Sequence, residues 1–126
     1  MNKEEIEKYI KSLISKATDV NVYNDNANQS SCYPYIVIDS SKIDTNDFPK
    51  VNIELEINIW DKHNSYKTVN QIADDIQNYL NHENHTNENI IGTFYMNIRN
   101  NLPDVDKALK RCLMQFDIEL YFLKED

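Results

Sequence analysis

Four acidic side chains occupy two segments in which apolar and polar residues alternate strictly, and they are the first candidates for chemistry. Apolar residues fill every second position between 51 and 60, and the same pattern runs from 110 to 123. A period of two is typical of strands with one buried face. If the two strands are neighbours, the acids share the opposite face: Glu54, Glu56, Asp117 and Glu119.

Paired carboxylates on a sheet face could hold a divalent metal and cleave a phosphodiester bond, but this chemistry usually also needs a basic residue for the phosphate. In Glu54-Leu55-Glu56, a second acid stands where a nuclease strand of this kind carries a lysine. The bases are expected at strand ends, away from these acids: Arg99, Lys107, Lys110 and Arg111. We therefore predict no enzyme activity, no catalytic residue and no cofactor. The acids are interpreted as a solvated or assembly face, and a small metal-dependent nuclease using Glu54 and Glu56 is the lesser alternative.

A second metal hypothesis rests on His82 and His85, which lie in a polar segment without a nearby cysteine. Two ligands do not make a metal site, so we predict none. Cys32 and Cys112 are far apart in the sequence and are interpreted as reduced thiols.

Two aromatic residues fall on the polar side of the alternating segments and point to an interface. Trp60 and Tyr121 have no core to enter there, and these residue types are enriched among interface anchors. The alternative is a bend or bulge that returns Trp60 to the core. In the interface hypothesis, three bases near strand ends meet two acids of the next subunit: Arg99, Lys110 and Arg111 with Asp74 and Asp75.

The elements that must position these residues follow from hydrophobic periodicity. Helices are predicted at 3–17 and 65–81, and strands at 20–23, 33–38, 51–60, 90–99 and 110–123. The predicted fold is α+β in the order α-β-β-β-α-β-β. It has a mostly antiparallel sheet of about four to five strands with two helices packed on one face, in one domain over 1–126.

Composition excludes several function classes. The 126 residues carry a formal charge of −8 and no basic cluster, so stable nucleic-acid binding is not expected. A single glycine excludes the P-loop and the dinucleotide-binding fingerprint, which need several. No apolar run approaches the ~20 residues of a membrane span, and the charged first residues do not read as a secretory signal.

Several segments, taken in order, resemble one family of virus proteins. The segment Tyr33-Pro34-Tyr35-Ile36-Val37-Ile38 is similar to the first main strand of the tail-terminator, or tail-completion, proteins of long-tailed bacteriophages. The stretch from Val51 to Asp61 resembles their second strand, which ends in a tryptophan or similar residue. Ile90-Ile91-Gly92 and the stretch from Arg111 to Leu120 resemble the start of the next strand and the closing strand.

The resemblance implies a structural virion protein encoded by a phage or prophage. It would cap the tail tube as a homo-oligomer, a hexameric ring, stop tube polymerisation and provide the surface for head–tail joining. The implied partners are the tail tube protein and a head–tail connector or neck protein, without a membrane and with only transient DNA passage. The implied location is the tail–neck junction of the virion, after synthesis in the bacterial host cytoplasm. Another neck or connector component is the alternative, because neighbouring components share this element order.

Overall fold

The computed structural model of the chain describes residues 3–24, 32–87 and 89–123. These residues form two helices and one six-stranded sheet. The elements are α1 (Lys3–Ala17), β1 (Asn21–Asn24), β2 (Tyr35–Asp44), β3 (Lys50–Lys62), α2 (Lys67–Leu80), β4 (Asn84–Thr86), β5 (Ile90–Leu102) and β6 (Leu109–Phe122).

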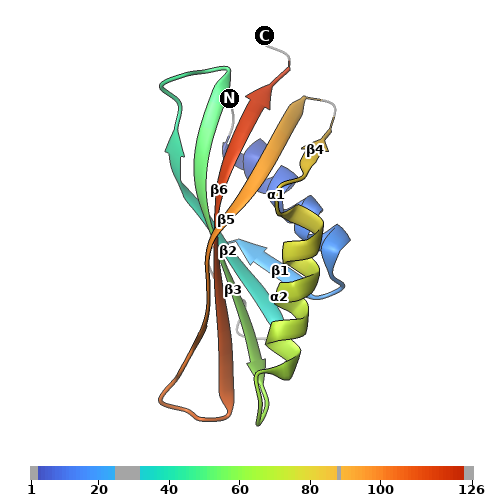
Figure 1. Cartoon of the computed structure of the whole chain (residues 1–126), viewed down its shortest axis with the longest axis vertical. Coiled ribbons are helices and arrows are strands. Elements are labelled where there is room, and N and C mark those ends of the chain that lie inside the picture. The colour runs from blue at the N-terminus through green and yellow to red at the C-terminus, as the bar shows by residue number, and fades with distance from the viewer. Residues whose placement is uncertain (1–2, 25–31, 88, 124–126) are drawn as a thin grey trace.

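The sheet has the spatial order β1-β2-β3-β6-β5-β4. β1 runs parallel to β2, and every other neighbouring pair is antiparallel. Both helices lie against the same face, and the sheet is so strongly twisted that β5 and β6 cross β2 and β3 in the view of Figure 1. This handed twist is the normal response of long strands to backbone sterics. The two ends of the sheet therefore face different directions.

The core lies between the helices and the inner face of the sheet. Each helix presents an apolar stripe, because its apolar residues recur every three to four positions. In α1 the stripe includes Ile6, Ile10 and Ile14, which have no exposed surface. Alternate residues of β3 and β6 on the inner face of the sheet pack against these stripes. Ile57 and Phe116 are among them and are also fully buried. Burial of such side chains contributes about 1.5–3 kcal/mol each to folding.

The structure corrects the predicted fold class. The sheet has six strands instead of four to five, and the order becomes α-β-β-β-α-β-β-β because 84–86, predicted as loop, forms β4. This three-residue strand contains only polar residues, so it gives no hydrophobic signal; it is defined by backbone pairing with β5. The sheet is also mixed, since β1 is parallel to β2.

Two strands are longer than their sequence pattern because each contains a bulge. The register shift between Asp39 and Lys42 lets β2 continue through a segment that was predicted as a connection. A second shift, between Met96 and Ile98, carries β5 on to Leu102. An extra residue in one strand reverses which side chains point to the core, so strict alternation fails beyond it.

No helix in the described part of the chain is long and apolar enough to cross a membrane. The two cysteines are free thiols; Cys32 is exposed and Cys112 is buried in the core. Burial raises the pKa of the Cys112 thiol, which accords with its interpretation as a small core residue.

Candidate assembly surface

The outer face of the sheet, opposite the helices, carries the acids and aromatics that the sequence singled out. Strand register assembles this face from rows of side chains that cross β2, β3, β6 and β5. Half-exposed Val37 and Leu113 and exposed Tyr95 and Ile98 are part of it. These apolar side chains alternate with polar ones along the rows, so the face is mixed in character.

The predicted acids do share this face, because β3 and β6 are neighbours. Glu54 is directly opposite Asp117, and Glu119 is opposite Asn52 in the next row. We call Glu54, Glu56, Asp117 and Glu119 the acidic patch. Asp44 and Lys42 of β2 border it, and the patch contains a groove of about 550 Å³. Like charges directly opposite each other on a sheet oppose folding, so the Glu54–Asp117 pair is a cost to stability.

Two lysines partly neutralise the acidic patch. Lys42 Nζ lies 4.0 Å from a Glu54 carboxylate oxygen, and Lys50 Nζ lies 2.9 Å from Glu119. Its hydrogen bond to Glu119 raises the pKa of Lys50. The expectation that no lysine lies near the acids was therefore wrong, because the β2–β3 hairpin brings Lys42 opposite Glu54. Exposed pairs of this type contribute little to stability.

Trp60 lies on the outer face near the other end of β3. Its cross-strand neighbours are Tyr35 on one side and Arg111 on the other. The Arg111 guanidinium carbon lies 5.1 Å from the centre of the Trp60 ring, within the range of a cation–π contact. Arg111 Nε also donates a 2.7 Å hydrogen bond to Asn58 Oδ1. The half-buried Trp60 thus stays with polar-face neighbours, and the register shows no bulge that returns it to the core.

More aromatic side chains gather beside Trp60. The ring of Tyr35 lies 5.2 Å from that of Tyr33 and 6.2 Å from that of Tyr23. We call Tyr23, Tyr33, Tyr35, Trp60 and Arg111 the aromatic–arginine patch. The sequence analysis did not group the three tyrosines of this patch. Tyr23 lies on the short edge strand β1, and only the pairing of β1 with β2 brings it to the same face as Tyr35.

Tyr121, the second predicted interface aromatic, is at the opposite end of the outer face. It is 45% exposed and is paired with Lys50 of β3 and Ile91 of β5. It therefore borders the acidic patch and is separate from Trp60.

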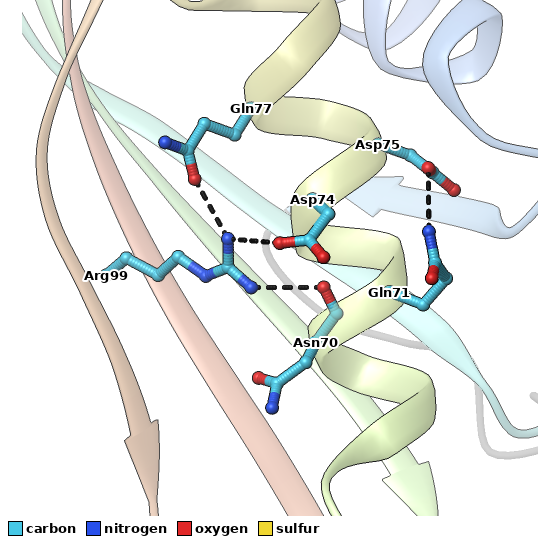
Figure 2. Close-up of polar contacts among 6 residues, drawn as sticks. All are labelled: Asn70, Gln71, Asp74, Asp75, Gln77 and Arg99. Carbon is cyan, nitrogen blue, oxygen red and sulfur yellow. Dashed lines mark hydrogen bonds and ion pairs between the residues drawn. The ribbon is translucent and has the colours of Figure 1, made fainter.

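Arg99 lies on the inner side of the sheet and not at an outer edge. The bulge after Met96 turns it towards α2, and Figure 2 shows its side chain reaching residues of that helix. Its guanidinium donates hydrogen bonds to Asp74 at 2.7 Å, to Gln77 at 2.9 Å and to the carbonyl oxygen of Asn70 at 3.0 Å. The Arg99–Asp74 ion pair was predicted to join two subunits, but it forms within one chain and fastens α2 to β5.

The remaining predicted interface residues also have partners within the chain. Asp75 points away from Arg99 and accepts a 3.1 Å hydrogen bond from Gln71, as Figure 2 shows. Lys110 donates to the carbonyl oxygen of Lys107, and its ammonium group lies 5.3 Å from the centre of the Tyr66 ring. Neither residue is placed beside Trp60 as an outward-facing charge.

No metal centre is assembled in the described segments. Residues 3–24, 32–87 and 89–123 contain no group of three or more His, Cys, Asp or Glu side chains arranged to hold a metal ion. The two histidines of the metal hypothesis diverge. The ring of His85 lies tilted against that of Tyr79, with 4.8 Å between ring centres, and its Nε2 lies 3.0 Å from the Tyr79 carbonyl oxygen, whereas the ring of His82 packs against Tyr95.

Comparison with known proteins gives a structural likeness only. No protein-family model and no curated protein matches the sequence. The fold is similar to that of a chain in the virion of a native gene transfer agent particle, with a TM-score of 0.67 and 8% sequence identity. The match covers 92% of this chain and 97% of the other. At this identity the likeness establishes a shared fold over nearly the whole length of both chains.

Proposed function

We propose that this chain is a structural component of a phage-type virion. The observation that carries the proposal is the full-length fold likeness to a chain of a gene transfer agent virion. Because a fold can host many functions, the site must supply the rest of the argument. The outer sheet face does so, since it presents aromatic and apolar side chains on a surface that the chain's own helices leave uncovered.

The role is that of a tail terminator: a hexameric ring that caps the tail tube, ends its polymerisation and offers a docking surface to a neck or connector protein. Such a protein needs surfaces for its own copies, for the tube and for the neck. Trp60 and Tyr121 lie at opposite ends of the outer face and anchor contacts there. Aromatic residues serve well in this role because they bury a large area with few rotatable bonds.

The acidic surface suits the passage of DNA through such a ring. With a formal charge of −8, the chain repels phosphates and offers no stable nucleic-acid site. A ring of such acidic subunits would let DNA slide through without adhering. DNA contact in this role is transient.

We also propose that the chain is not an enzyme. Glu54 and Glu56 lie on an exposed sheet face, and Lys42 engages Glu54. The lesser alternative, a metal-dependent nuclease, predicts that the chain cleaves DNA in the presence of Mg²⁺ or Mn²⁺ and that Glu54→Gln abolishes the cleavage. That result would refute the structural role.

The test is electron microscopy of tail tubes assembled from the tube protein of the same phage or prophage. With wild-type chain, we expect tubes of uniform length that carry a cap. Trp60→Ala should leave tubes uncapped and variable in length, while circular dichroism shows the fold intact. The control is Phe48→Ala, which removes an exposed aromatic side chain from the turn between β2 and β3, outside the two patches. Uncapped tubes with wild-type chain, or its presence only at the neck, would point to another neck component.

A further inference from the structure

The two patches on the outer face have opposite electrostatic character. Arg111 is the charged group of the aromatic–arginine patch, and no carboxylate in residues 3–24, 32–87 and 89–123 forms an ion pair with it. The other patch has four acids, of which Glu54 and Glu119 contact lysines while Asp117 has no such partner among the described side chains. The outer face thus has a basic, aromatic end and an acidic end.

Most of the acidic patch is far from Arg111 within one chain; only Glu56 is connected to it, through Asn58, which donates a 2.9 Å hydrogen bond to Glu56 and accepts one from Arg111. Trp60 and Glu54 are six positions apart on β3, which corresponds to about 20 Å at the rise of a strand. Arg111 and Asp117 have the same spacing on the neighbouring strand. At physiological ionic strength the screening length is about 8 Å. Glu54, Asp117 and Glu119 therefore attract a complementary group largely independently of Arg111.

We infer that the partner of the aromatic–arginine patch is the acidic patch of a second copy of this chain. This inference rests on the proposed ring for its closure, and it names the contact from which the ring is built. Arg111 meets Asp117 and its neighbouring acids, while Trp60 and Tyr35 cover the apolar stems between them. The twist turns the two ends of the sheet in different directions, so a second copy seated on one end leaves the other end open. Repeated copies then continue in one direction until the ring closes.

The other two bases of the predicted interface, Arg99 and Lys110, are poorly placed for this contact. Arg99 is turned inwards and held by Asp74, Gln77 and Asn70. Lys110 is engaged with Tyr66 and the backbone of Lys107. Arg111 uses one of its five guanidinium N–H donors for the hydrogen bond to Asn58. Its remaining donors suit a carboxylate, which arginine binds in a two-pronged geometry.

A charge-swap experiment tests the pairing by sedimentation equilibrium over a concentration series. Arg111→Glu and Asp117→Lys should each weaken self-association at least tenfold, because each places like charges at the contact. An equimolar mixture of the two variants should recover wild-type association, since the introduced glutamate of one chain then faces the introduced lysine of the other. The controls are Lys11→Glu on α1 and Glu83→Lys beside β4, which make the same changes of net charge on exposed positions elsewhere.

Several results would overturn the inference. Wild-type chain that stays monomeric at millimolar concentration contradicts it, as do single reversals that associate normally or a mixture that associates no better than its components. Melting curves monitored by circular dichroism identify misfolding, and Arg111→Gln replaces Arg111→Glu if the latter does not fold. Tube capping is measured separately: normal capping by variants whose charge swaps leave self-association unchanged would refute this contact and leave the proposed function standing.

Discussion

At the scale of single residues, one close approach locks α1 onto the sheet. The Tyr9 phenol is 4% exposed and donates a 2.5 Å hydrogen bond to the carbonyl oxygen of His85 in β4. Burial raises the pKa of this phenol. The ring stacks near Phe94, with 6.5 Å between ring centres. The hydroxyl reaches β4 only because Gly92, across from His85, has no side chain.

Gly92→Ala should therefore destabilise the protein. The added Cβ would lie 2.4 Å from the Tyr9 hydroxyl and 2.7 Å from Leu120 Cδ2, so packed side chains must shift. We expect a loss of about 1–3 kcal/mol in the free energy of unfolding, as for other overpacked cores. Urea denaturation measures it. The loss should be smaller in a Tyr9→Phe background, and equal losses in both backgrounds would show that the hydroxyl is not the obstacle.

At the scale of elements, the long alternating segments were the most predictable part of the fold. Period-two alternation in 51–60 and 110–123 correctly separated buried residues from outward-facing acids, since both strands pair without a bulge. β4 could not be predicted because it buries no hydrophobic run. Arg99 was misplaced for another reason: the bulge in β5 is a backbone feature, and it reverses the side of every residue that follows.

Two adjacent residues of β6 test this assignment of faces as a matched pair. Phe116 is fully buried and Asp117 is exposed. Phe116→Ala should cost about 3–5 kcal/mol of stability, as large truncations in a core do. Asp117→Asn should be neutral or stabilise by up to about 1 kcal/mol, because it removes the repulsion from Glu54 across the strands. Thermal melting compares the two, and a reversed ranking would show that the faces are wrongly assigned.

The candidate surface was predictable in part. Strand parity alone placed the four acids and Trp60 on the outer face. The partners of the charged residues, in contrast, depend on contacts between distant segments. Lys42 reaches Glu54 through the β2–β3 hairpin, and Arg99 reaches Asp74 across the core. Such pairings arise from register and helix placement, which local patterns do not contain.

At the scale of the whole molecule, net charge governs which partners can approach. A chain with a formal charge of −8 repels duplex DNA, and its bases are dispersed or engaged. We expect no binding to a fluorescent duplex at physiological salt in an anisotropy titration. Non-specific binders reach about 10⁻⁴–10⁻⁶ M under such conditions. Micromolar binding that weakens as salt is added would contradict the prediction.

We propose that this chain closes the end of a tail tube as a ring. Cryo-electron microscopy of tube ends, assembled with purified chain, tests it most directly. The account predicts one six-fold ring at a single end of each tube, with the outer sheet face of each copy at the junction with the next. Bare tube ends, or a bound chain whose outer sheet face is solvent-exposed, would contradict it.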